Sequence, residues 1–176
     1  TRPMKLVILL PANGTGSNLR AIQEGIKQGT IHAEIAAVIS DADVTKESLL
    51  PTLQKYNPDY VCLTGWKQII PDEAVRNFKI LNIHPGLIPD TMDGVVKNPD
   101  DTDWLWNKGL FKNKAIQNFL DHKATYAGSS IHLLTHEFDF GPVIARCFEK
   151  IQPDDTVDSL YARLKVKENQ LWQKIF

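Results

Sequence analysis

Short apolar runs alternate with segments of helical periodicity through the first half of the chain, and this alternation is the strongest constraint on the fold. Residues 5–10, 35–39, 60–64 and 79–83 are the strand-like runs. The first is apolar without interruption, which is typical of a parallel strand covered on both faces. Strands and helices that alternate at this spacing form an open, mostly parallel sheet. The sequence therefore predicts an α/β fold with a doubly wound, Rossmann-like sheet.

Three helices are expected between these strands, over residues 19–27, 46–56 and 72–77. Leu19, Ile22 and Ile26 lie on one face of the first helix at the spacing of an amphipathic helix. Pro51 lies within the second segment, so we expect it in the first helical turn or at a kink.

The second half of the chain interrupts this pattern. Residues 90–110 are rich in Asp, Asn, Gly and Pro and contain Trp104 and Trp106. A connection of roughly 20 residues without its own secondary structure is longer than most, which indicates a lid, an insertion or an interaction loop. The alternative is that the two tryptophans only hold the loop against the body of the protein.

The remaining residues predict a helix over 112–122, strands over 129–134 and 142–148, and a last helix that begins near Thr156. Two strands joined by so short a connection should be antiparallel. We therefore expect antiparallel strands near the C-terminal end and a single domain over residues 1–176, with an insertion at about 90–110.

Composition limits the possible partners. The chain has 176 residues, 43% of them hydrophobic, and a formal net charge of −1. Nucleic-acid-binding domains usually carry a basic face, so we expect no nucleic-acid partner. No apolar run reaches about 18 residues, so we expect no membrane span. No secretory signal is recognisable, and Cys62 and Cys147 lie in apolar runs without metal-site spacing, which favours free thiols in a reducing cytoplasm.

A glycine-containing turn follows the first strand. Gly14 and Gly16 stand between that strand and the helix, an arrangement that directs backbone N–H groups and a helix N-terminus toward an anion. Leu19 stands where a dinucleotide-binding turn has its third glycine, so a single phosphate is the better match. A loop that merely turns the chain is the alternative.

Asn82 and His84 end the fourth strand. Residues two apart in a strand point to the same side, so both side chains should project together beside Pro85 and Gly86. Such a pair can donate hydrogen bonds to an oxygen that gains negative charge. The alternative is a strand-ending Asn and a His that faces a pocket wall. Loops after three parallel strands, near Gly14, Trp66 and His84, should converge at one edge of the sheet.

Three segments together resemble a known family. Residues 13–19 (NGTGSNL), 82–89 (NIHPGLIP) and 139–144 (DFGPVI) are similar to those of phosphoribosylglycinamide formyltransferase, also called glycinamide ribonucleotide transformylase. The similarity runs through nearly the whole chain in the same order. It implies a Rossmann-like formyltransferase fold and formyl transfer from 10-formyltetrahydrofolate, the co-substrate, to the amine of glycinamide ribonucleotide in purine biosynthesis.

The resemblance also implies roles for individual residues. The implied catalytic residues are Asn82, His84 and Asp139, with His132 near them. The implied ligands of the ribonucleotide phosphate and ribose are Gly16, Ser17, Asn18 and Glu168. The implied folate-binding segment is Gln68, Ile69 and Ile70. From the residues alone, Asp139 could simply occupy a tight turn, and a buried strand histidine is the preferred interpretation of His132.

Three features depart from the family pattern. The segment between Asp43 and Lys46 is shorter, so we expect that a strand or a basic phosphate ligand usually found there is missing, with Lys46 only a weak substitute. Gln68 stands where many members have Arg. The insertion at about 90–110 is longer than usual.

Formyl transfer to an amine suggests roles for the three implied catalytic residues. Asn82 and protonated His84 would donate hydrogen bonds to the oxyanion. Asp139 would keep His84 charged or orient a water that carries a proton. We expect the carboxylate to raise the pKa of His84 more than burial lowers it. No metal is required.

Other functions remain open at this point. These are another folate-dependent formyltransferase, a formyltetrahydrofolate hydrolase, and a non-catalytic module that binds a nucleotide through the Gly14 loop. The expected partners are small-molecule substrates, namely glycinamide ribonucleotide and formylfolate. The expected assembly is a monomer or a homodimer.

Overall fold

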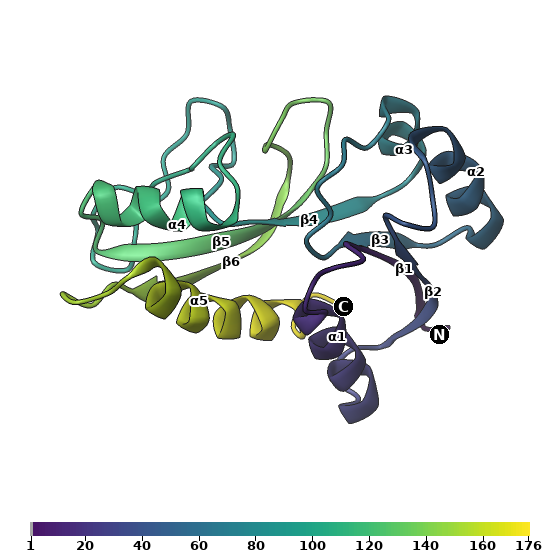
Figure 1. The fold of residues 1–176 in the computed structure, drawn as a ribbon, viewed down its shortest axis with the longest axis horizontal. Coiled ribbons are helices and arrows are strands. Elements are labelled where there is room, and N and C mark those ends of the chain that lie inside the picture. Colours follow the sequence, from purple (N-terminus) through teal and green to yellow (C-terminus); the bar gives the residue numbers. More distant parts are fainter. Residues whose placement is uncertain (1) are drawn as a thin grey trace.

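The computed structural model describes residues 2–176, and its core is a six-stranded sheet with the order β2-β1-β3-β4-β5-β6 (Figure 1). The strands are β1 (Met4–Leu10), β2 (Ala33–Ser40), β3 (Tyr60–Leu63), β4 (Ile80–His84), β5 (Tyr126–Leu133) and β6 (Val143–Lys150). Strands β2, β1, β3 and β4 pair in parallel, whereas β4–β5 and β5–β6 are antiparallel. Both parts of the fold prediction are confirmed.

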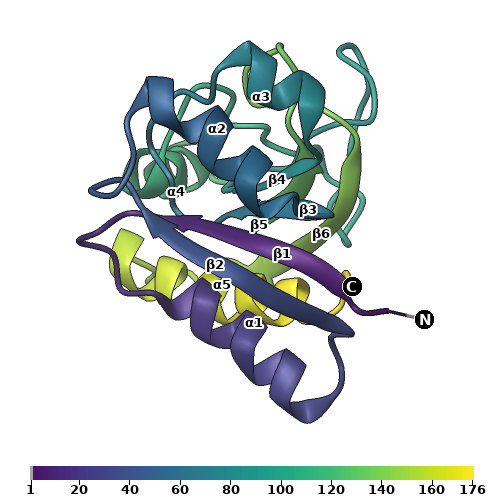
Figure 2. The ribbon, with the colours of Figure 1, turned by 90° about the vertical axis from the view of Figure 1, so that its right-hand side faces the viewer.

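Helices cover both faces of this sheet (Figures 1 and 2). Helices α1 (Ser17–Gln28) and α5 (Val157–Trp172) lie on one face. On the other face lie α2 (Lys46–Tyr56) and α3 (Asp72–Asn77), whereas α4 (Lys112–Asp121) packs beside α5 against β5 in a third core cluster. The sheet is therefore doubly wound, as predicted.

The central strand β1 shows why both faces must be covered. Leu6, Val7, Ile8 and Leu9 have no exposed surface. Val7 and Leu9 pack in the core cluster that includes α2 and α3, while Leu6 and Ile8 pack in the cluster that includes α1 and α5. A continuous apolar run can thus pack into a hydrophobic core on each face of the sheet, because alternate side chains point to opposite faces.

Of the two positions expected for Pro51, the first helical turn is wrong, and a kink at this residue stays a prediction. Helix α2 begins at Lys46, which places Pro51 in the second turn. The start is set by a capping box, in which Thr45 and Ser48 each accept a hydrogen bond from the other's backbone N–H. The cap satisfies two N–H groups at the helix end and fixes the start at Lys46, as predicted, so Pro51 is the sixth residue of the helix.

The connection from β4 to α4 contains the insertion. Lys97 and Asp103 form an isolated bridge and an ion pair at 2.6 Å within it. The chain then returns over the end of β4, where the Leu87 N–H donates to the carbonyl oxygen of Leu105 at 3.0 Å. The Asn107 side chain donates to the Pro85 carbonyl oxygen at 3.0 Å. These contacts bring residues 105–109 against the strand end that carries His84.

None of the helices among residues 2–176 combines the length and the apolar composition needed to cross a bilayer. Cys62 and Cys147 are both free, as predicted.

Candidate active site

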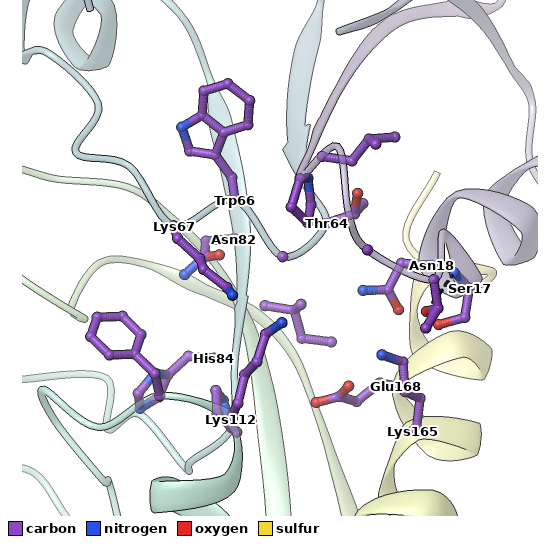
Figure 3. A pocket seen from close by; sticks show the side chains of 18 of the residues that line it. Ser17, Asn18, Thr64, Trp66, Lys67, Asn82, His84, Lys112, Lys165 and Glu168 are labelled. Carbon is purple, nitrogen blue, oxygen red and sulfur yellow. Dashed lines mark hydrogen bonds between the residues drawn. The ribbon is translucent and has the colours of Figure 1, made fainter. Parts of the chain in front are cut away.

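A pocket of about 600 Å³ opens at the carboxyl ends of β1, β3 and β4. Its walls come from the loops after β1 and β3, the end of β4, the start of α4, Asp139 and one face of α5 (Figure 3). The predicted convergence of the three loops near Gly14, Trp66 and His84 is confirmed, since residues of all three line this pocket.

His84 and Asp139 meet at the inner wall of the pocket. The His84 side chain is only 2% exposed, and its Nδ1 lies 3.5 Å from Oδ1 of Asp139. Nε2 of His84 lies 2.7 Å from the carbonyl oxygen of Trp106. A carbonyl oxygen can only accept, so Nε2 carries the proton that it donates to Trp106.

The insertion also holds Asp139. The Gly109 N–H donates to Oδ2 of Asp139 at 2.8 Å, and the indole Nε1–H of Trp106 donates to the Asp139 carbonyl oxygen at 2.9 Å. Asp139 itself has a φ of 49°, a left-handed conformation that non-glycine residues adopt rarely. Residues of the insertion therefore contact two of the three implied catalytic residues. The sequence interpretation did not assign the insertion this place.

The expectation that Asp139 raises the pKa of His84 above its ordinary value is wrong for this structure. Burial of the ring is the largest effect and lowers the pKa of His84, and the Asp139 carboxylate and the Trp106 carbonyl offset it only in part. The ring has almost no contact with water, while the carboxylate is 3.5 Å away and is also engaged by Gly109. Desolvation of the cation therefore outweighs the attraction.

Asn82 lines the same pocket and is supported from behind by His132. Nδ2 of Asn82 lies 3.5 Å from Nε2 of His132, which faces it in the β4–β5 register. The Nδ1–H of His132 donates to the Leu133 carbonyl oxygen at 3.1 Å. Burial and the nearby His84 lower the pKa of His132 to about 4. His132 is thus a neutral, hydrogen-bonded strand residue, as the preferred interpretation held.

The Gly14 loop leads directly into α1 along the pocket rim. Gly16 caps the helix with a φ of 72°, a conformation that glycine adopts without steric cost. Ser17 Oγ and Asn18 Oδ1 are buried without a hydrogen-bond partner among residues 2–176. Buried polar atoms usually have hydrogen-bond partners, so we expect a ligand or a water to supply the missing hydrogen bonds of these two oxygens at the pocket rim.

Glu168 reaches the pocket from α5. It is 4% exposed and accepts a hydrogen bond from Ser129 Oγ at 2.5 Å. Burial raises the pKa of Glu168, although Ser129 and Lys165 oppose the shift. Figure 3 shows Lys165 one helical turn away beside Glu168 and Asn18.

The implied folate-binding segment lies outside the pocket wall. Gln68 is exposed, Ile69 is 78% exposed, and Ile70 is buried in the core cluster that includes α2 and α3. From the same loop, Trp66 and Lys67 line the pocket instead.

Three lysines were missed by the sequence interpretation, namely Lys67, Lys112 and Lys165. Lys165 could have been found, since it precedes Glu168 by three residues on one helix and shares its face. Lys67 and Lys112 are isolated lysines in segments far apart in the sequence, and no pattern among their neighbours indicates that they line a pocket. No group of three or more His, Cys, Asp or Glu side chains arranged to hold a metal occurs in the described part of the chain, residues 2–176.

Comparison with known proteins identifies the family to which this chain is similar. The Formyl transferase family profile matches residues 43–175. The chain is 26% identical to the chloroplastic phosphoribosylglycinamide formyltransferase of Arabidopsis thaliana, over 99% of this chain and 64% of that protein. The chain thus spans a little under two thirds of this relative.

Solved structures share the fold. Glycinamide ribonucleotide transformylase 1 from Symbiobacterium toebii superposes with a TM-score of 0.78 at 24% identity, covering 98% of this chain and 85% of that one. HypX from Aquifex aeolicus, solved in complex with tetrahydrofolic acid, gives a TM-score of 0.66 at 20% identity, covering 97% of this chain and 26% of that one. With a profile that matches most of its residues and this shared fold, the chain belongs to the formyl transferase family.

Proposed function

We propose that this protein transfers the formyl group of 10-formyltetrahydrofolate to the amine of glycinamide ribonucleotide, giving formylglycinamide ribonucleotide for purine biosynthesis. The observation that carries the proposal is that one pocket contains both the Gly14–Asn18 loop and the Asn82, His84 and Asp139 side chains. A relative and a structural neighbour that carry this enzyme's name support it. The tetrahydrofolic acid bound by HypX supports the folate co-substrate.

The phosphate of the ribonucleotide binds at the start of α1 in this proposal. Backbone N–H groups of Gly16, Ser17 and Asn18 lie at the positive end of the helix dipole, and α1 has no acidic residue in its first turn to compete with an anion. The unpartnered Ser17 hydroxyl, which can donate to a phosphate oxygen, lies at the same place. Glu168 holds the ribose from the opposite wall. The segment Gln68, Ile69 and Ile70 contacts the folate through the exposed Gln68 and Ile69, while the buried Ile70 holds the segment in the core.

The reaction then needs stabilisation of charge and movement of one proton. The substrate amine attacks the formyl carbon, an oxyanion forms, and the folate nitrogen leaves with a proton. Asn82 donates an N–H to the oxyanion, because one hydrogen of its amide faces His132 and the other is free for the pocket. Asp139 orients the water that carries the proton from the amine to the leaving nitrogen.

His84 supplies the second donor. The Trp106 carbonyl oxygen holds its ring with the proton on Nε2, and the formyl oxygen takes the place of that carbonyl when the substrates bind. A neutral imidazole N–H is sufficient for this role, which agrees with the lowered pKa of His84.

We further propose the following setting for the enzyme. Residues 1–176 form one domain with an insertion at about 90–110, and the protein acts in the cytoplasm as a monomer or a homodimer. It uses no metal and binds neither nucleic acid nor membranes.

The test is an assay of purified protein with glycinamide ribonucleotide and 10-formyltetrahydrofolate, in which both products are quantified. Stoichiometric formylglycinamide ribonucleotide and tetrahydrofolate are expected. Formate with tetrahydrofolate would instead identify a hydrolase. Binding of the ribonucleotide without turnover would identify a non-catalytic module, and turnover only with another amine would identify a different formyltransferase.

A further inference from the structure

We propose that Lys67 and Lys112 together form a second anion-binding subsite, separate from the Gly14–Asn18 loop, which binds a phosphate or carboxylate group of one of the two substrates. This inference rests on the proposed function for the identity of the substrates.

The first observation is the position of the two side chains. Lys67 comes from the loop after β3 and Lys112 is the first residue of α4, yet both line the same pocket. Figure 3 shows their ammonium ends directed toward each other, on the side of the pocket away from Ser17. Two cations that converge from different elements form a fork suited to an anion with two or more oxygen atoms.

The second observation is that neither cation is neutralised. No ion pair among residues 2–176 includes Lys67 or Lys112. The pocket carboxylates are already engaged, since Asp139 is held by Gly109 and faces His84, and Glu168 is buried against Ser129. The pocket therefore carries an excess of positive charge.

The third observation is that the two ammonium groups repel each other. Burial, then repulsion from Lys67, and to a smaller extent from Lys165, lowers the pKa of Lys112. Adjacent cations without a counter-ion are unfavourable, and a bound anion removes that repulsion while gaining two charge-assisted hydrogen bonds. The arrangement is thus stabilised by ligand binding.

Each substrate offers a suitable group. The ribonucleotide has a phosphate, and the folate has the carboxylates of its glutamyl tail. Both present oxygen atoms to two ammonium groups in the same way, so the chemistry of the subsite is shared. The experiment below separates the two sources.

The experiment measures binding by calorimetry for the parent, Lys67→Met and Lys112→Met. The probes are glycinamide ribonucleotide, 10-formyltetrahydrofolate and the carboxamide of 10-formyltetrahydropteroate, which has a neutral amide in place of the glutamyl group and carries no carboxylate. Loss of one charged hydrogen bond should weaken the ligand that occupies the subsite by about tenfold. Lys114→Met is the matched control, because Lys114 is an exposed residue of the same helix that does not line the pocket.

Weaker binding of formyltetrahydrofolate but not of the pteroate carboxamide would assign the subsite to the glutamyl carboxylate. Weaker binding of the ribonucleotide alone would assign it to the phosphate. Either result supports the proposal. Changes below about twofold for every probe, or an equal loss in Lys114→Met, would overturn it.

A second measurement is independent of turnover and of the substrates. Competitive acylation at pH 8, read by mass spectrometry, should label Lys112 faster than Lys114, and Lys67→Met should slow this labelling. Inorganic phosphate should protect Lys112 in the parent. If neither substrate binds, protection by phosphate still supports the subsite, and absence of protection overturns it. Failure of the proposed function can be told apart from failure of the subsite, because it appears as binding of the substrates without formyl transfer.

Discussion

The contact between Gly86 and the insertion gives the sharpest prediction. A Cβ atom at Gly86 would lie 1.9 Å from the Trp106 carbonyl oxygen, 2.8 Å from the Trp106 carbonyl carbon and 2.8 Å from Nε2 of His84. Two of these atoms belong to the backbone, which cannot rotate away. The substitution Gly86→Ala must therefore displace the insertion from His84.

The magnitude follows from these distances. Ordinary contact between a carbon and an oxygen atom needs more than 3 Å, so the Trp106 carbonyl must retreat by about 1.3 Å. Its hydrogen bond from His84, now 2.7 Å, would then be about 4 Å, which is no longer a hydrogen bond. Overpacking of this kind costs about 1–3 kcal/mol. For a chain of this length each kcal/mol lowers the Tm by about 2–4 °C, so we expect a fall of roughly 2–12 °C.

The assay combines urea and thermal unfolding with ¹⁵N NMR of the histidine ring. In the parent, His84 should show the neutral form with the proton on Nε2. In Gly86→Ala that preference should weaken. Gly94→Ala is the control, because the closest contact of a Cβ there is the Thr91 hydroxyl oxygen, which can rotate away. Parent-like stability together with an unchanged His84 spectrum would refute the assignment of the Trp106 carbonyl as the group that holds the ring.

Four further predictions address the other groups of the site. Asn82→Ala should lower turnover by about 10²–10³-fold if its amide stabilises the oxyanion, and a loss below about threefold in steady-state kinetics would contradict that role. Gly16→Val should weaken ribonucleotide binding far more than folate binding, since a β-branched residue is strained at a φ of 72°, and calorimetry showing equal losses would count against the phosphate loop. Asp139→Asn should lower the pKa of His84 further, because the carboxylate is what opposes burial, and an unchanged or higher pKa in NMR titrations would exclude that interaction. The folded-state pKa of His132, about 4, is below its unfolded value, so its contribution to stability is present above about pH 6.5 and is lost as the pH falls toward 4. In urea unfolding, the free energy of unfolding of the parent should fall by about 2 kcal/mol between pH 7 and pH 5, and this fall should be absent from His132→Gln. The same pH dependence in both proteins would contradict the assignment.

Much of the fold could be predicted because its signals are local. The bounds of α2 and α3 agree with the predicted ranges, since a capping box begins α2 and two acidic residues occupy the first turn of α3. The apolar run of β1 predicted a strand buried on both faces. Strand ends were less certain, because pairing partners decide them. Thus β4 extends to His84 and β5 begins at Tyr126, where their antiparallel neighbours continue the hydrogen bonding.

The candidate site was predictable only in outline. Parallel strands bring their carboxyl ends to one edge, so Asn82, His84 and the Gly14 loop could be placed together in advance. The position of Lys67 and Lys112 could not, because it depends on how a loop and a helix from distant parts of the chain fold against each other. The role of Trp106 depends in the same way on the path of the insertion.

The sequence by itself determined the alternation of strands and helices, the edge at which the loops meet, and the chemical types present there. Only the tertiary structure decided whether the pKa of His84 is raised or lowered, and so whether its neutral form is favoured. Burial and the Asp139 carboxylate act on its pKa in opposite directions, and the sequence contains both influences without their distances. The outcome depends on the 2% exposure of the ring and the 3.5 Å separation from the carboxylate. Desolvation and attraction both vary steeply with such distances, so their balance exists only once distant segments are packed together.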